Sequence, residues 1–286
     1  MIIPYKDVRS DGNIRVHHLT PNASKNSPVA VFCHPTGFCG LVFASVACHL
    51  HGLNVFAIDM RSHGYSDSRD VTNWSGFAKD IQAAFTYISE FTQTQRFIGI
   101  GISSGSSAHI LNAKQFPDLY HGLYLCEPIL FPPGADLKDR EMLAESAKRR
   151  RDTFGSRDEA FNKFSTRGPL STLNQSALAL YCAHGFRTTK EGVTLCCSKE
   201  DERSIYLSGG ANGVFEALPD IKAPVKIVYG ETSTTINAQR ADLIAKQMQN
   251  AQVEKLEKAG HFTLFDQPYA GAQSISRFVN SLPSKD

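Results

Sequence analysis

The residues best suited to do chemistry lie at 101–105, where the sequence reads Gly-Ile-Ser-Ser-Gly. This G-x-S-x-G pattern follows an apolar run at 96–103, in the strand–turn–helix context of a nucleophilic serine. Glycines are needed on both sides of such a serine, because larger side chains would collide in the sharp turn. The turn would hold the hydroxyl at a helix N-terminus, where backbone N–H groups favour a developing anion. We therefore predict that Ser103 is a nucleophile; its flanking glycines favour it over Ser104.

Short, almost continuous apolar runs alternate with helical patterns around this motif. Such runs are typical of strands covered on both faces. Strands are expected at 28–34, 53–60, 96–103, 123–129, 225–231 and 252–257, and helices at 39–51, 74–91, 104–116 and 237–249. Residues 2–19 predict an antiparallel pair turned at 11–13. This alternation predicts an α/β protein with a mostly parallel sheet and helices on both faces.

The stretch 130–218 interrupts the alternation. It opens with Phe131 and a Pro-Pro-Gly turn, and the strand pattern resumes only after it. Helical patterns lie near 140–154, 157–164 and 174–184. We therefore expect a helical insertion between two strands of the sheet. The basic run at 148–151 indicates a solvated helix face, and an anion or phosphate site is the alternative.

The composition excludes several classes of protein. The chain has 286 residues, of which 42% are hydrophobic, so it is not a disordered chain. A net charge of +2 argues against a nucleic-acid partner, and no apolar run reaches the length of a membrane span. Seven cysteines without a CxxC pair, and an N-terminus without a secretory signal, predict a reduced, cytoplasmic protein. No cluster of Cys and His has zinc-site spacing, so we expect no metal and no organic cofactor.

Four segments, in this order, resemble motifs of the α/β-hydrolase fold family. They are HPTGF at 34–38, DMRSHGYSDS at 59–68, GISSG at 101–105 and AGHFTLFDQP at 259–268. The first is similar to the family's oxyanion loop, with Pro35 in place of the usual glycine, as in an epoxide-hydrolase-like subgroup with H-x-[TN]-G-F and a serine nucleophile. The second has Ser62 where the family has glycine. The resemblance covers nearly the whole chain and implies a mostly parallel eight-stranded sheet with a helical cap.

The resemblance also implies roles for individual residues. Ser103 would be the nucleophile, and His261 its general base and later the acid that protonates the leaving group. The backbone N–H groups of Thr36 and Ser104 would form the oxyanion hole.

The carboxylate that orients the histidine has two candidate positions. In the family it most often follows the late strand, but here that turn reads GETSTT, with Ser233 and Thr234 where an aspartate is expected. Some dehalogenases and fungal-toxin lactonases of the family instead use a glutamate after the strand that follows the elbow helix, which is Glu127 here. A carboxylate at the end of an apolar strand is costly to bury without a partner, and His261 would be that partner. We predict Glu127 as the acid, with Glu231 as its rival.

The insertion at 130–218 lies where the family places its lid, over a core of 1–129 and 219–286. A lid of this kind bounds an apolar pocket that selects the substrate. The expected substrate-binding residues are Phe38, Phe131, Tyr181 and His184.

The resemblance implies a serine hydrolase that acts on a small-molecule carboxylic ester or lactone. Because the elbow holds serine rather than aspartate, the intermediate would be an acyl-enzyme. One alternative is a carbon–carbon bond hydrolase with the same triad, and another is a non-catalytic ligand-binding protein of the same fold. The sequence leaves the substrate and the oligomeric state open, a homodimer included.

Overall fold

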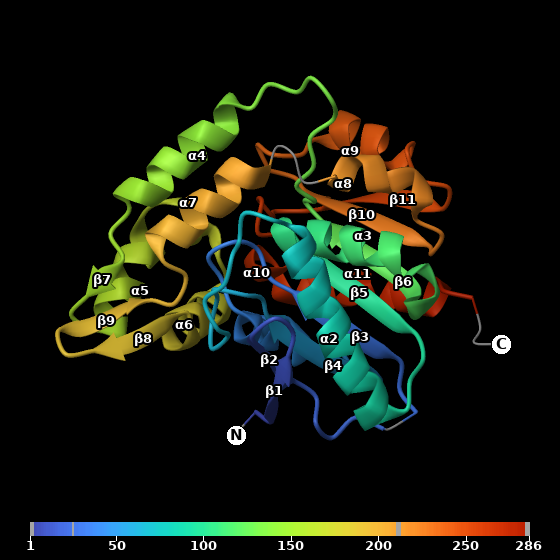
Figure 1. Ribbon diagram of the computed structural model, residues 1–286, viewed down its shortest axis with the longest axis horizontal. Coiled ribbons are helices and arrows are strands. Elements are labelled where there is room, and N and C mark those ends of the chain that lie inside the picture. The colour runs from blue at the N-terminus through green and yellow to red at the C-terminus, as the bar shows by residue number, and fades with distance from the viewer. Residues whose placement is uncertain (1–2, 25, 210–212, 284–286) are drawn as a thin grey trace.

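The computed structural model describes residues 3–24, 26–209 and 213–283 (Figure 1). Its main feature is an eight-stranded sheet with the strand order β1-β2-β4-β3-β5-β6-β10-β11. The strands are β1 (Tyr5–Arg9), β2 (Asn13–His18), β3 (Val29–Cys33), β4 (Asn54–Asp59), β5 (Phe97–Ile102), β6 (Tyr120–Cys126), β10 (Val225–Gly230) and β11 (Ala251–Leu256). Every neighbouring pair from β4 to β11 is parallel, whereas β2 pairs antiparallel with both β1 and β4. The predicted mostly parallel sheet is thus confirmed. The opening hairpin also forms, although Ile2 of its predicted range lies outside the described residues.

The central strands are buried on both faces. Every residue of β3, β4, β5 and β6 is buried, which agrees with the continuous apolar runs in the sequence. Parallel strands need long crossovers, and the helices between them supply these. The carboxyl ends of β5, β6 and β10 therefore meet at one edge of the sheet, where loops from distant parts of the sequence come together.

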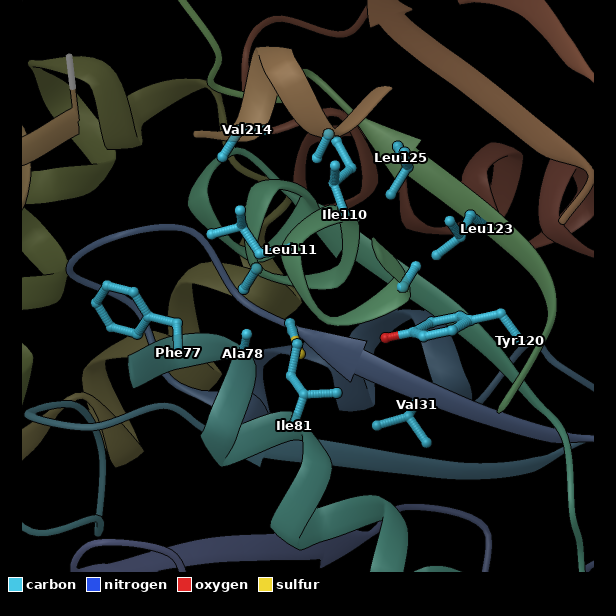
Figure 2. Close-up of a cluster of buried hydrophobic side chains, with 14 of the residues drawn as sticks. Val31, Phe77, Ala78, Ile81, Ile110, Leu111, Tyr120, Leu123, Leu125 and Val214 are labelled. Carbon is cyan, nitrogen blue, oxygen red and sulfur yellow. The ribbon is translucent and has the colours of Figure 1, made fainter. Parts of the chain in front are cut away.

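Helices cover both faces of the sheet. One face carries α2 (Ser75–Thr92), α3 (Ser104–Gln115), α8 (Val214–Ala217) and α9 (Ala238–Ala245). The other carries η1 (Gly40–Phe43), α1 (Ala44–Ala47), α10 (Thr263–Asp266) and α11 (Pro268–Ser281). Figure 2 shows the first core, in which apolar side chains of α2 and α3 meet residues of the sheet such as Val31 and Tyr120. The helix expected at 39–51 is replaced by the short η1 and α1, which end at Ala47.

Most of the insertion forms a lobe beside the sheet (Figure 1). It contains α4 (Lys138–Arg149), β7 (Thr153–Phe154), α5 (Arg157–Thr166), η3 (Pro169–Thr172), α6 (Gln175–His184), β8 (Phe186–Thr189), β9 (Gly192–Leu195) and α7 (Lys199–Ser208). The strands β7, β9 and β8 form a small antiparallel sheet, so the insertion is not wholly helical as expected. These strands are two to four residues long, too short for an alternating pattern to appear in the sequence. The helix expected to reach residue 154 ends at Arg149, because Arg150 has an extended backbone and Thr153–Phe154 form β7.

Two further features concern the predicted cellular setting. All seven cysteines carry free thiols, and five of them are buried. In the described part of the chain, no helix is both long enough and apolar enough to cross a bilayer.

Candidate active site

Ser103 lies in a strained turn between β5 and α3. Its φ of 56° is in the region that L-residues rarely adopt, and its backbone N–H donates to Cys126 O on the neighbouring strand at 2.9 Å. A Cβ on Gly105 would lie 2.1 Å from Cys33 O, and one on Gly101 would lie 2.4 Å from Ser106 N. Both glycines are therefore required by the close approach of backbone, as the G-x-S-x-G pattern predicts.

Glu127 is fully buried at the end of β6, and three groups hold its carboxylate. Oε1 accepts a hydrogen bond from Gly230 N–H at 2.8 Å, and Oε2 accepts one from Ser233 Oγ at 2.8 Å. Oε2 also lies 3.2 Å from His261 Nδ1. The imidazole thus uses Nδ1 on the carboxylate, which leaves Nε2 as the nitrogen free to serve as a base. The structure brings Glu127 and His261 together, as the sequence predicts.

Glu231 lies on the surface and has other partners. Its side chain is bound by Lys255 Nζ at 3.3 Å and by the Lys258 backbone N–H at 2.9 Å. The Lys258 N–H, helped by Lys255, lowers the pKa of this carboxyl. Among the described residues, the hydrogen bonds of the Glu231 carboxylate thus go to Lys255 and Lys258, and none goes to His261.

Ser233 has a role that the sequence reasoning missed. It stands at a position where the family commonly has the catalytic aspartate, and its hydroxyl donates to Glu127 instead. The turn motif was the available signal, since the residue in the family's usual acid position contacts Glu127, the acid predicted here.

Asp266 is a second residue that was missed, and it fixes the loop that carries His261. Its Oδ2 accepts from Gly260 N–H at 2.7 Å, and its Oδ1 accepts from Thr172 Oγ1 of the insertion at 2.9 Å. Burial raises the pKa of this carboxyl. Asp266 lies within the segment 259–268 that resembles the family's histidine loop. Its place in that segment was the signal in the sequence that could have identified it.

The two segments expected to form the oxyanion hole are in direct contact. Thr36 Oγ1 donates to Ser104 Oγ at 3.0 Å, so the loop after β3 touches the first turn of α3. His63 supports this loop by accepting the Gly37 backbone N–H on Nε2 at 3.0 Å. Burial lowers the pKa of His63 to about 3, which keeps the imidazole neutral and able to accept.

Asp59 anchors the same loop from the end of β4. Its buried carboxylate accepts backbone N–H groups of Gly40 at 2.6 Å and Tyr65 at 2.9 Å, and it pairs with His17 Nε2 at 2.9 Å. Burial alone would raise the pKa of Asp59, but His17 and these hydrogen bonds outweigh it and lower the pKa to about 2. The ionised form is therefore part of the folded structure.

We expect Asp59→Asn to lower the free energy of unfolding at pH 7 by about 2 kcal/mol. That figure corresponds to a carboxyl that titrates near 3.8 when unfolded and at about 2 when folded. Because the folded pKa is the lower one, the stabilisation is present above about pH 4 and is lost as the pH falls through about 2. Urea unfolding between pH 7 and 2.5 should show wild type and variant converging, with the exposed Asp118→Asn as control. A gap that stayed constant over this range would assign the effect to packing rather than charge.

The expected substrate-binding residues do not all lie together. The rings of Phe38 and Tyr181 are 5.0 Å apart, and Phe38 also contacts Phe262, the neighbour of His261, at 4.9 Å. His184 instead pairs with Tyr65 OH at 3.2 Å. The Phe131 ring lies 3.6 Å from the position that a Cβ on Gly209 would occupy. Phe38 therefore packs directly against the His261 loop, and Tyr181 reaches that loop through Phe38.

The described residues offer no group of side chains that could bind a metal ion. Within residues 3–24, 26–209 and 213–283, no three His, Cys, Asp or Glu side chains are grouped so as to hold a metal ion.

Comparisons with known proteins agree with this geometry. Residues 30–272 match the family model described as the alpha/beta hydrolase family. The monoacylglycerol lipase ABHD6 of Mus musculus is 34% identical over 71 residues, which are 25% of this chain and 21% of that protein. The chain thus aligns with only about a fifth of that relative's length.

Solved structures resemble the whole chain in fold. An E-2-(acetamidomethylene)succinate hydrolase superimposes with a TM-score of 0.85 at 19% identity, covering 98% of this chain and 100% of that one. An esterase from Thermogutta terrifontis superimposes with a TM-score of 0.72 at 16% identity, covering 97% and 98%. At such identities the likeness shows the fold alone. Together with the family match, the sheet order and the four motifs, it leads to one conclusion: the chain belongs to the alpha/beta hydrolase family.

Proposed function

We propose that the protein is a serine hydrolase that cleaves a small-molecule carboxylic ester or lactone. The observation that supports the proposal is the buried Glu127 carboxylate 3.2 Å from His261 Nδ1. The elbow serine, Ser103, bonds through its backbone N–H to Cys126 O, the residue before Glu127. A carboxylate in this position holds the imidazole in one orientation and stabilises its cation. The three residues of the proposed triad follow three strands of the parallel part of the sheet: Ser103 follows β5, Glu127 follows β6 and His261 follows β11. The carboxyl ends of these strands lie at the same edge of the sheet.

The reaction proceeds in two steps, acylation of the serine and hydrolysis of the acyl-enzyme. First, Ser103 Oγ attacks the ester carbonyl carbon while His261 Nε2 takes the hydroxyl proton. The carbon–oxygen bond to the alcohol then breaks, and His261 returns the proton to the departing oxygen, which leaves an acyl-enzyme. In the second step His261 removes a proton from water, the hydroxide attacks the acyl carbon, and Ser103 regains its proton as the acid is released.

The backbone N–H groups of Thr36 and Ser104 would stabilise the negative charge that develops on the carbonyl oxygen. Ser104 N lies in the first turn of α3, and the contact between the Thr36 and Ser104 hydroxyls holds the two donors near each other. Donors fixed in advance are worth more than those that must reorganise during the reaction, which is why such a contact matters. We further propose that the insertion at 130–218 forms a lid. Two of its residues contact the core near the site: Tyr181 packs on Phe38, and Thr172 donates to Asp266.

The first experiment treats the purified protein with a fluorophosphonate and with a panel of chromogenic esters, thioesters and lactones. The proposal expects covalent labelling and turnover of at least one class. Treatment with the fluorophosphonate should also abolish turnover of the esters, thioesters or lactones. A protein that is neither labelled nor active on any compound would contradict the proposal and favour a ligand-binding role. Cleavage of a vinylogous diketone in place of esters would favour the carbon–carbon hydrolase.

A further inference from the structure

One arginine of the basic run 148–151 differs from its neighbours. Lys148, Arg149 and Arg151 are exposed, whereas Arg150 is largely covered, with a quarter of its side chain accessible. The change occurs where α4 ends, because Arg150 has an extended backbone with ψ of 147° and no longer follows the helix surface. The run is therefore a solvated helix face at Lys148 and Arg149, whereas Arg151 is exposed beyond the end of the helix and Arg150 is largely covered.

The guanidinium of Arg150 is only partly used by the protein. Nη1 lies 2.7 Å from Glu202 Oε2 of α7, and Glu202 Oε1 accepts a hydrogen bond from Tyr206 OH at 3.1 Å. Nε and Nη2 of Arg150 are buried, as is Oε2 of Glu202, and in the described part of the chain none of these three atoms has a hydrogen-bond partner. Buried polar groups are almost always hydrogen-bonded, so two such donors on one side chain require an explanation.

Nε and Nη2 form one edge of the planar guanidinium fork. A carboxylate fits such an edge with two parallel hydrogen bonds, one to each oxygen. Glu202 pairs with Nη1, so the buried Nε–Nη2 edge has no carboxylate partner among the described residues. A neutral ester oxygen would satisfy only one of the two donors well.

This guanidinium lies against the oxyanion loop. A Cβ on Gly37 would lie 3.4 Å from Glu202 Oε1 and 3.6 Å from Arg150 Nη1. Gly37 directly follows Thr36, whose N–H we place in the oxyanion hole, and its own N–H is held by His63. The guanidinium of Arg150 therefore lies beside the residue that follows Thr36, with Nη1 as the nitrogen that faces the loop.

The surroundings of Arg150 carry little opposing charge. Burial raises the pKa of Tyr206, Tyr181 and Cys197, so these groups are neutral near pH 7. His63 is also neutral there, since burial lowers its pKa to about 3. Burial likewise raises the pKa of Glu202 despite the nearby Arg150. Among these groups, the acidic side chain that faces Arg150 is thus Glu202.

We propose that the Nε–Nη2 edge of Arg150 binds a carboxylate of the substrate, so that the natural substrate is an ester or lactone carrying a free carboxylate near its reacting carbonyl. The inference rests on the proposed function, because it names the substrate class of that site. It makes Arg150 a specificity-determining residue, held in place by Glu202.

The test uses two pairs of chromogenic esters that differ by one carboxylate. Mono-4-nitrophenyl adipate and 4-nitrophenyl hexanoate place it on the acyl side, whereas 3-carboxy-4-nitrophenyl butyrate and 4-nitrophenyl butyrate place it on the leaving group. We expect the wild type to prefer the charged member of one pair. Arg150→Gln should lower that preference, taken as the ratio of kcat/KM values, by about 10- to 100-fold, mainly through KM. Arg149→Gln, the exposed neighbour, is the matched control and should keep the wild-type ratio.

Two further variants separate binding from a structural ion pair. Glu202→Gln removes the opposing charge at nearly constant volume and should increase the preference for the charged ester. Arg150→Lys keeps the charge but loses the planar fork, so it should give a ratio between those of the wild type and Arg150→Gln. It replaces Arg150→Gln in the test if that variant proves unstable in thermal unfolding. A ratio that is the same in all folded variants would overturn the inference and leave Arg150 and Glu202 as a structural pair.

The two proposals can fail separately. If no ester is cleaved and no label is taken up, the proposed function fails, and titration calorimetry with adipate then tests Arg150 alone. Adipate binding that Arg150→Gln abolishes would support the carboxylate site without catalysis. If neutral esters are cleaved but neither charged ester is preferred, the hydrolase stands and the carboxylate site is wrong.

Discussion

Replacing Ser103 by alanine is expected to abolish both ester turnover and fluorophosphonate labelling. The variant lacks the oxygen that forms the acyl-enzyme, so kcat should fall by at least about 10⁴-fold, with any residual rate coming from the oxyanion hole and substrate binding. Thermal unfolding should show an intact fold, because the Ser103 side chain makes no hydrogen bond among those found within the described residues. Initial rates on the best ester of the panel, with mass spectrometry of the labelled protein, provide the measurement.

Ser104→Ala is the matched control, one residue further along the chain. It removes a hydroxyl that accepts from Thr36 Oγ1 but leaves the backbone N–H of the oxyanion hole in place. We expect a loss of less than about 10-fold in kcat and unchanged labelling. If labelling were lost in Ser104→Ala and kept in Ser103→Ala, the nucleophile would be Ser104.

Glu127→Gln should lower kcat by about 10³- to 10⁴-fold while the protein stays folded. A neutral amide at this position cannot stabilise the imidazolium, and its NH₂ group can force His261 into the wrong tautomer. Glutamine retains an oxygen that can accept the Gly230 N–H, which limits the structural damage. The kinetic measurement is kcat and kcat/KM on the same ester, with thermal unfolding as the test of folding.

Glu231→Gln is the matched control for the acid. Glu231 is exposed and bonded to Lys255 and Lys258, so its loss should change kcat by less than about 2-fold. A collapse of activity in Glu231→Gln, with Glu127→Gln near wild type, would assign the acid to Glu231. It would also require the turn after β10 to rearrange during the reaction.

The sheet could be predicted from the sequence because its signals are local. Strands covered on both faces must be apolar at every position, and the runs that became β3, β4, β5 and β6 have that property. The G-x-S-x-G turn could be predicted as well, since close backbone approach at Gly101 and Gly105 excludes any other residue there. The strands of the insertion could not, because four residues such as Gly192–Leu195 are too few to show a period.

The sequence by itself determined the apolar strands and, through four motifs, the family. It predicted Ser103 from a turn with a steric cause and His261 from the resemblance of its loop. Only the tertiary structure decided which carboxylate faces His261: Glu127 and Glu231 both follow strands, and the contacts of each depend on how neighbouring strand ends are placed across the sheet. The same holds for Ser233, which contacts Glu127 from 106 residues away in the chain. Arg150 is the clearest case, because burial and free donors belong to the folded lobe, whereas in the sequence it is one of four adjacent basic residues.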